Sequence, residues 1–336
     1  MLFERDVMQA NNVIIDGLQY INWDKKTFEK TRDSGINAVH VTIAYWENFS
    51  EVIDNINQWN QYFRKFNDII MHARTAEDIL EAKRQNKLGI VFGFQNCSPI
   101  EDNIANIEIL HRLGVRIMQL SYNNQSLLAT GCYENKDSGI TRFGRQAIKE
   151  MNRVGMVIDM SHSAEQSTLE AIELSERPIA ITHANPIFFH NALRNKSDTV
   201  IKALGESGGI LGFSMYPFHL KNGSNCTLGE FCQMIAKTVD MMSIDQVAIG
   251  SDLCENWDYS KLEWMRSGRW TFSADYGEGS ATNKAWPKQP NWFKGAEDIM
   301  NIADGLRKVG FKEEEVNKIM GGNWLNFFNS SFGPMS

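Results

Sequence analysis

The sequence lacks the features that mark membrane, secreted and nucleic-acid-binding proteins. No uncharged run reaches the roughly 20 residues of a membrane-spanning helix. The first residues, Met1–Asp6, include charges where a signal peptide needs an apolar stretch. No Lys/Arg-rich run offers a phosphate-binding surface, and the formal net charge is −7. We therefore expect a cytoplasmic protein that binds neither nucleic acid nor membrane.

Cysteine is scarce, and its placement argues against a disulfide framework. The five cysteines are odd in number and irregularly spaced, so we expect free thiols. They are Cys97, Cys132, Cys226, Cys232 and Cys254. No repeat or Pro/Gly/Ser-rich linker divides the chain, and 336 residues with 43% hydrophobic content fit one large α/β barrel. Residues 1–336 are therefore predicted to form a single barrel domain.

Short β-rich runs alternate with amphipathic helical stretches along most of the chain. The clearest helical patterns cover Asp102–Leu113, Arg142–Arg153, Ser163–Ser175 and Leu228–Met242. Such alternation is typical of βα units around a parallel sheet, and eight strand candidates favour a closed (β/α)8 TIM barrel. The candidates are Asn12–Leu18, Ala38–Thr42, Gly89–Gln95, Val115–Tyr122, Met156–His162, Pro178–His183, Gly209–Ser214 and Gln246–Asp252.

Polar side chains stand at the carboxyl ends of these predicted strands. Gln95, Tyr122, His162, His183 and Asp252 each follow an apolar run. In an α/β barrel these strand ends face one mouth, where catalytic groups collect. One such residue alone could simply meet solvent, but two histidines on adjacent strands with an aspartate two strands later form a candidate metal or acid–base site. The remaining histidines are interpreted as core or surface residues: His40, His72, His111, His190 and His219.

The same strand ends carry motifs that resemble the membrane (renal) dipeptidase family of zinc peptidases. The most specific stretches are Gly139–Arg145, Glu150–His162, Thr182-His183, Arg194-Asn195 and Ile249–Asp252. The resemblance runs from Val13–Gly17 to Gly322–Trp324, nearly the whole chain. It implies a TIM barrel of the metal-dependent amidohydrolase type, dipeptidase-like hydrolase activity and a homodimer.

The zinc ligands of this family are only partly retained. His162 and His183 match the ligands of the family's second zinc ion. The family pattern Asp-Gly-His-Asn-Asp, whose His and last Asp bind the first zinc, reads Asp-Gly-Leu-Gln-Tyr here, so Leu18 and Tyr20 replace both ligands. The glutamate that bridges the two ions is matched by Gln95.

Charge balance then limits the metal content. Two divalent ions roughly 3.5 Å apart need carboxylates around them, and of the family's three only Asp252 is matched here. We expect one zinc ion at most, held by His162, His183 and Gln95, or none. Cys97 or Cys254 could supply another ligand, although a free cysteine is more often a small buried apolar residue.

The resemblance also implies catalytic and substrate-binding roles. Asp252 corresponds to the group that orients or deprotonates the attacking water, and Tyr122 stands where the family has a histidine near the scissile bond. Arg194 would grip a substrate carboxylate, with Asn195 and Tyr133 as further substrate-binding residues. From the sequence alone, Arg194 fits a solvated turn and helix cap equally well.

The leading prediction is a dipeptidase-like, metal-dependent hydrolase that acts on a dipeptide or a small N-substituted amino-acid derivative. We expect weak or absent activity on ordinary dipeptides because the bridging carboxylate is missing. One alternative is a metal-free or non-hydrolytic enzyme, a lyase or isomerase that uses Tyr122, His162, His183 and Asp252 as acid–base groups. A place in amine or methylated-glycine catabolism is implied by Asp16–Leu18, Gly93–Asn96 and Thr130–Glu134, which are similar to a bacterial dipeptidase-like subgroup. The other is a catalytically inactive homologue that binds its ligand through Arg194.

One segment of the chain departs from the βα pattern. Residues Cys254–Lys294 show little periodicity but contain five tryptophans, and a loop of this length is usually functional or disordered. The aromatic content argues against disorder. We expect an aromatic-rich insertion over residues 254–294, either a lid over the barrel mouth or a subunit-contact arm. The tryptophans are Trp257, Trp264, Trp270, Trp286 and Trp292.

Overall fold

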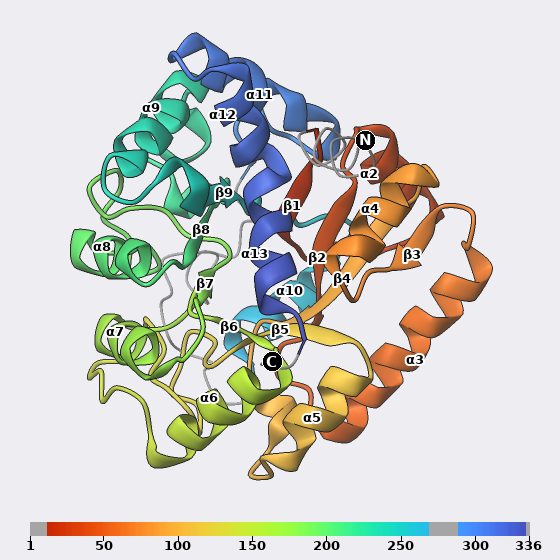
Figure 1. The fold of residues 1–336 in the computed structure, drawn as a ribbon, viewed down its shortest axis with the longest axis vertical. Coiled ribbons are helices and arrows are strands. Elements are labelled where there is room, and N and C mark those ends of the chain that lie inside the picture. The colour runs from red at the N-terminus through yellow and green to blue at the C-terminus, as the bar shows by residue number, and fades with distance from the viewer. Residues whose placement is uncertain (1–11, 269–287, 334–336) are drawn as a thin grey trace.

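The computed structural model describes residues 12–268 and 288–333. Parallel strands follow one another around a nearly closed barrel, with helices outside it (Figure 1). A hydrogen bond from Tyr20 N to Leu253 O joins the first strand to the segment after the last one. The predicted (β/α)8 barrel is confirmed. Its strands are β1 (Ile15–Gln19), β2 (Ala38–Ala44), β4 (Leu88–Phe94), β5 (Val115–Gln119), β6 (Val157–Asp159), β7 (Ala180–Ile181), β8 (Ile210–Phe213) and β9 (Val247–Ile249).

Helices cover the outside of the barrel and connect most of its strands. A short additional strand, β3 (Ile70–His72), pairs with β4 outside the barrel order. It is missing from the predicted set because three residues are too few to show alternation. The helices are α2 (Lys25–Asp33), α3 (Phe49–Lys65), α4 (Ala76–Arg84), α5 (Ala105–Arg112), α6 (Arg142–Val154), α7 (Glu165–Leu174), α8 (Asp198–Glu206), α9 (Leu228–Val239), α10 (Tyr259–Ser267), α11 (Ile299–Lys308), α12 (Glu313–Asn317) and α13 (Asn323–Ser331).

Helix α6 shows how local sequence positions one of the site strands. The Thr141 side chain accepts a hydrogen bond from the Gly144 N–H and begins the helix. The helix ends at Gly155, whose φ of 81° is a left-handed conformation that glycine adopts without strain. The chain then enters β6 almost at once. The two helix caps therefore fix the start of the strand that precedes His162.

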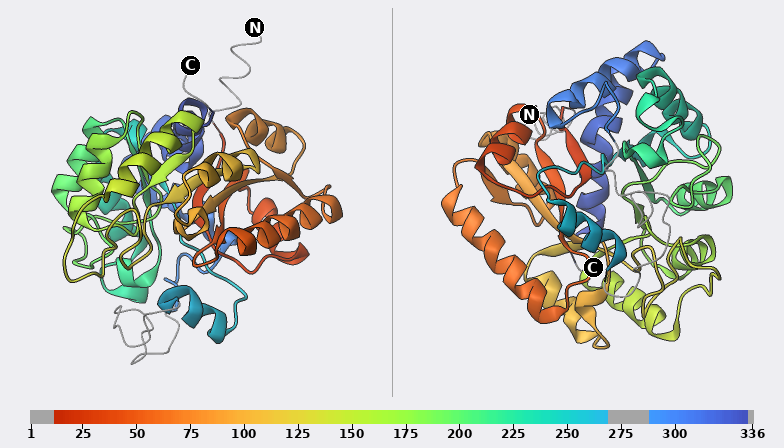
Figure 2. Two further views of the ribbon diagram at one scale, coloured as in Figure 1. Left: turned by 90° about the horizontal axis from the view of Figure 1, so that it is seen from below. Right: turned by 180° about the vertical axis from the view of Figure 1, so that it is seen from behind.

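The two ends of the barrel are closed by different helices (Figures 1 and 2). Helix α13 crosses one end, where the fully buried Trp324 donates from Nε1 to Ile249 O at 2.8 Å. A Cβ at Gly17 would lie 2.5 Å from the Trp324 ring, so this close approach requires glycine. Helix α10 lies over the opposite end. Leu262 of α10 and the predicted site residues at the strand ends line the same cavity. The strand ends that carry the predicted site therefore lie under α10.

The aromatic-rich segment contains a helix that its sequence pattern does not predict. Helix α10 begins after Asp258, whose side chain accepts a hydrogen bond from the Lys261 N–H. Residues 269–287, including Trp270 and Trp286, lie outside the described residues. The roles of this segment as a lid or as a contact arm stay predictions. Within the described ranges, no helix combines the length and apolar character that crossing a membrane requires.

His40 is buried in the barrel interior, and we expect it to make the stability of the protein sensitive to acid. Its Nδ1 bonds to Gly17 O at 2.7 Å, and burial lowers its pKa to about 4. In the unfolded chain this imidazole binds a proton below about pH 6.5, whereas in the folded protein it binds one only below about pH 4. The free energy of unfolding therefore falls as the pH drops through this interval. We expect His40→Gln to reduce the loss of unfolding free energy between pH 7 and pH 4 by about 3 kcal/mol.

Denaturant unfolding at several pH values measures this dependence. His190→Gln, at a half-buried position, is the matched control for the loss of an imidazole. Burial raises the pKa of Asp16 to about 6, which has the opposite effect on stability, but Asp16 is present in every variant and its contribution cancels. An unchanged dependence in His40→Gln would show that this imidazole is not held neutral.

Candidate functional site

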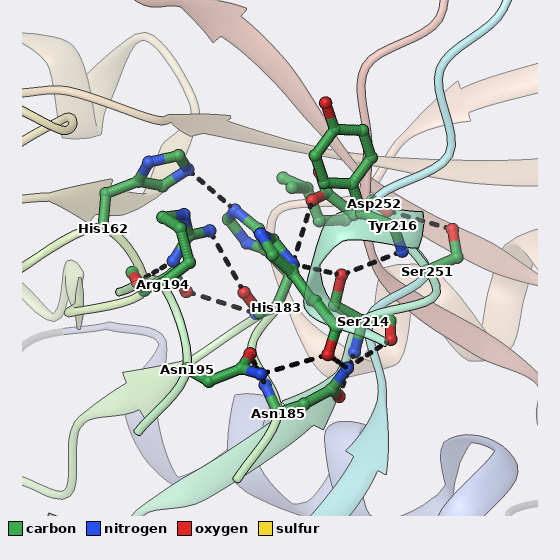
Figure 3. Close-up of polar contacts among 12 residues, drawn as sticks. His162, His183, Asn185, Arg194, Asn195, Ser214, Tyr216, Ser251 and Asp252 are labelled. Atoms are coloured by element: carbon green, nitrogen blue, oxygen red, sulfur yellow. Dashed lines mark hydrogen bonds and ion pairs between the residues drawn. The ribbon is translucent and has the colours of Figure 1, made fainter. Parts of the chain in front are cut away.

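Two imidazoles and one amide meet at the carboxyl ends of three barrel strands. His162 follows β6, His183 follows β7 and Gln95 follows β4. The Nε2 atoms of His162 and His183 lie 3.1 Å apart and face each other (Figure 3). His162 Nε2 also lies 3.0 Å from Gln95 Oε1. Gln95 donates from Nε2 to Thr42 Oγ1 at 2.9 Å, and this bond turns its carbonyl oxygen toward His162.

The other ring nitrogen of each histidine faces a hydrogen-bond acceptor. His162 Nδ1 lies 2.7 Å from Asn123 Oδ1, and His183 Nδ1 lies 2.8 Å from Thr182 Oγ1. Thr182 donates its own hydroxyl hydrogen to Asp159 Oδ2 at 2.6 Å, so it accepts from His183. Each neutral imidazole therefore carries its proton on Nδ1, and both Nε2 lone pairs point into the space between the rings.

Burial keeps both imidazoles uncharged. It lowers the pKa of His162 and of His183 well below the usual value, and the positive charge of Arg194 lowers both further. Two facing lone pairs 3.1 Å apart repel each other unless a cation or a proton lies between them. Gln95 Oε1 adds a third acceptor to the same place. The three atoms therefore fit a divalent metal ion with neutral nitrogen and oxygen ligands.

Among the described residues, no carboxylate, thiol or third imidazole completes this set of ligands. Over residues 12–268 and 288–333, no group of three or more His, Cys, Asp or Glu side chains is placed to hold a metal. The ligand set therefore depends on the Gln95 oxygen. All five cysteines are free thiols, as predicted. Cys97 and Cys254 are absent from the described lining of the cavity beside the histidines, and burial raises the pKa of the Cys97 thiol to about 11.

Thr182→Val tests the hydrogen bond behind His183. The change removes the acceptor for His183 Nδ1 while nearly keeping the side-chain shape, so we expect the affinity for Zn²⁺ to fall about 10- to 100-fold. Isothermal titration calorimetry on metal-free protein measures the affinity. Thr238→Val removes a buried hydroxyl that donates to Met234 O within α9, and it should leave zinc affinity unchanged. Equal affinities in Thr182→Val and wild type would contradict the assigned imidazole orientation.

A cavity adjoins His162; we call it the site cavity. The Tyr122 ring stacks on the His162 ring, with centroids 4.1 Å apart. Asp252 follows β9 and has a φ of 60°, a left-handed conformation that aspartate tolerates better than most residues. The described residues that line the site cavity are Tyr20, Gln95, Tyr122, Asn123, His162, Arg194, Tyr216, His219, Asp252, Leu262, Met265 and Arg266.

Arg194 is buried rather than solvated, which corrects the interpretation as an exposed turn. Its side chain donates from Nη1 to Ser161 O and from Nη2 to His183 O at 3.3 Å, and the residue is 2% exposed. A guanidinium has five N–H donors in a planar fork, so these two carbonyls leave donors for a ligand. The position of Arg194 on the site cavity allows it to bind a carboxylate there.

Of the other predicted positions, one lines the site cavity and three are absent from its described lining. Tyr20 lines the cavity, and burial raises its pKa well above the usual value. Leu18 is fully buried and is not among the described lining residues. Asn195 stabilises the surrounding loop. Its Oδ1 accepts a hydrogen bond from Asn185 N at 3.1 Å, and its Nδ2 donates to His190 O and His219 O. Tyr133 is half-buried and is likewise absent from the described lining.

Sequence reasoning missed six of the described residues that line the site cavity: Asn123, Tyr216, His219, Leu262, Met265 and Arg266. His219, interpreted as a core or surface residue, is buried and lines it, with Nδ1 2.9 Å from Ser214 Oγ. Tyr216 packs against it, with ring centroids 5.1 Å apart. Arg266 reaches the cavity from α10. The one available signal was that Tyr216 and His219 closely follow the predicted strand Gly209–Ser214.

Comparison with solved structures places the fold among dipeptidases and amidohydrolases. An amidohydrolase from Pseudomonas aeruginosa is 33% identical, with a TM-score of 0.89 over 97% of this chain and 98% of that one. A metallo peptidase from Rhodobacter sphaeroides, solved with a phosphinate mimic of the dipeptide L-Ala-D-Ala, is 14% identical and shares the fold. Its TM-score is 0.77 over 95% of this chain and 99% of that one.

Sequence comparison assigns the family. Dipeptidase tcpJ of Claviceps purpurea is 22% identical over 81% of this chain, and Dipeptidase verJ of Clonostachys rogersoniana is 26% identical over 63%. The chain spans 58% and 55% of the lengths of these two relatives. Residues 21–262 match the model of the membrane dipeptidase family, peptidase family M19. Because this match covers more than half of the 336 residues, the chain belongs to the membrane dipeptidase family.

Proposed function

We propose that this protein hydrolyses the amide bond of a dipeptide or a small N-substituted amino acid with the help of one divalent metal ion, zinc. The observation that carries the proposal is the convergence of lone pairs from His162, His183 and Gln95 beside Asp252 and Arg194. Membership of the M19 family supports amide hydrolysis as the chemistry. The dipeptide mimic bound to the Rhodobacter sphaeroides metallo peptidase supports a ligand of that size.

Each side chain has a distinct part in this reaction. An ion held by the two imidazoles and the Gln95 oxygen would supply a Lewis acid that polarises the scissile carbonyl. Asp252 accepts the proton of the attacking water and returns it to the leaving amine. Arg194 binds the substrate carboxylate and so holds the amide in place. Tyr122, stacked on His162, restricts the orientation of that imidazole.

Metal analysis combined with turnover assays tests the proposal. Protein purified without chelator should contain about one zinc ion per chain, and activity on N-acyl amino acids or dipeptides should disappear with a chelator and return with Zn²⁺. Absence of bound metal together with absence of turnover would end the proposal. Activity that survives chelation would instead indicate metal-free acid–base catalysis. The homodimer that the family resemblance implies stays a prediction, which light scattering would measure.

A further inference from the structure

A buried lysine binds the turn that carries His162. This turn, residues 160–163, follows β6, and we call it the His162 turn. Lys196 donates from Nζ to Met160 O at 2.9 Å and to Ser163 O at 2.8 Å, and the residue is 3% exposed. These two carbonyls belong to the first and the last residue of the turn. One side-chain nitrogen therefore bridges both ends of the His162 turn.

Neighbouring residues hold the remaining carbonyls of the His162 turn. Arg194 Nη1 donates to Ser161 O, and Cys132 N donates to His162 O at 2.9 Å. The residues of the turn are buried, so their carbonyls depend on donors from the protein rather than from bulk water. With all four carbonyls bonded, the backbone that positions the His162 ring has little freedom to move.

The backbone of Lys196 is fixed to the segment that follows His183. Lys196 N donates to Asn185 O at 2.8 Å, and Lys196 O accepts from Ile187 N at 2.9 Å. This pairing forms a parallel bridge between Lys196 and Pro186. Through its side chain and its backbone, one residue thus connects the two segments that carry the facing imidazoles.

We infer that Lys196 is a positioning residue: it fixes the His162 turn against the segment after His183 and so sets the spacing of the two Nε2 atoms. These atoms lie 3.1 Å apart. Lys196 is absent from the described lining of the site cavity, so it acts through the backbone rather than on a substrate. The effect on metal binding rests on the proposed function, but the placement of His162 can be measured without a metal ion.

The two hydrogen bonds do not require a charged lysine. Burial, and then the positive charge of Arg194, lowers the pKa of Lys196 to about 7. An ammonium group has three N–H donors and a neutral amine has two, so either form can donate to both carbonyls. Removal of the donors, rather than a change of pH, is therefore the way to test the inference.

Lys196→Met removes both donors and nearly keeps the length of the side chain. Without these bonds the His162 turn should relax, and the His162 ring should shift relative to His183. Isothermal titration calorimetry on metal-free protein should give a Zn²⁺ affinity about 10- to 100-fold below wild type, as expected when a group that orients a metal ligand is lost. Lys196→Gln keeps a donor and should show a smaller loss. Thermal unfolding verifies that each variant is folded, and if Lys196→Met does not fold, Lys196→Gln decides.

A second measurement needs no metal ion. NMR of protein labelled with ¹⁵N-histidine records the imidazole nitrogens of all seven histidines, and His162→Ala identifies the His162 signals. In Lys196→Met the His162 signals should move, whereas those of His190 should keep their wild-type positions. Lys318→Met is the matched control, because it removes an ammonium group bonded to Asp245 Oδ1 at 2.9 Å, just before α13 at the opposite end of the barrel. It should change neither the His162 signals nor the zinc affinity.

The outcomes separate this inference from the proposed function. Wild-type zinc affinity in the Lys196 variants, or His162 signals that stay in place, would overturn the inference. A lower affinity together with shifted His162 signals, in a folded protein, supports it. If the wild-type protein itself binds no zinc, the proposed function fails, and the NMR comparison alone decides whether Lys196 positions His162.

Discussion

Replacing His162 or His183 by alanine is expected to abolish binding of the divalent ion and to lower kcat/KM about 1000-fold. The two Nε2 atoms lie 3.1 Å apart with their lone pairs facing, so each supplies one of the three converging ligands. Loss of either leaves one imidazole and one neutral amide oxygen, too few for a catalytic zinc site. A metal ion supplies several kcal/mol of transition-state stabilisation, which corresponds to a rate factor of about this size.

Metal content and turnover should be measured on the same preparations. His190→Ala is the matched control because it removes a half-buried imidazole that is absent from the described lining of the site cavity. It should keep both the ion and the activity. Retention of stoichiometric zinc in His162→Ala or His183→Ala would place the metal elsewhere. Loss of zinc with unchanged kcat/KM would show that the ion is not used in catalysis.

The barrel and the strand-end residues could be predicted because they depend on local sequence. Apolar runs bounded by turns mark parallel strands, and a barrel gathers the carboxyl ends of its strands at one mouth. His162, His183 and Gln95 follow three such runs and meet there with Nε2 and Oε1 atoms 3.0–3.1 Å apart. The direction in which each ring faces could not be read in advance, because it depends on Asn123 and Thr182.

Two of the residues that sequence reasoning missed lie on long connections. Arg266 and His219 enter the site cavity from α10 and from the loop after β8, and no periodicity indicates where such segments fold back. Asn195 adjoins Arg194 in sequence, but its side-chain amide bonds to Asn185 N and to carbonyls of the surrounding loop. Its substrate-binding role stays a prediction.

The replaced ligand positions support the proposal of one metal ion rather than two. Tyr20, at a position where the family pattern has a zinc-binding aspartate, lies in a cluster of phenols with Tyr45 and Tyr122. Burial raises the pKa of Tyr20 and Tyr45 well above the usual value, so both stay protonated and neutral. Neutral phenols provide no anionic ligand to offset a second cation.

Asp252→Asn is expected to lower kcat about 100- to 10,000-fold while the metal content stays at the wild-type level. The amide cannot accept a proton from the attacking water. The backbone at position 252 should be undisturbed. Asparagine tolerates the left-handed φ of 60°, and the hydrogen bond from Asp252 N to Leu18 O does not involve the side chain. Steady-state kinetics and elemental analysis on one preparation measure both quantities.

Asp252→Ala separates the chemistry from the backbone strain. Alanine costs roughly 1–2 kcal/mol in a left-handed conformation, so this variant should lose stability as well as activity, whereas Asp252→Asn should lose activity alone. If Asp252→Asn keeps its metal and more than about a tenth of the wild-type kcat, the proton acceptor lies elsewhere. His219 would then be the candidate, because its Nδ1 lies 4.0 Å from Asp252 Oδ2 on the same cavity.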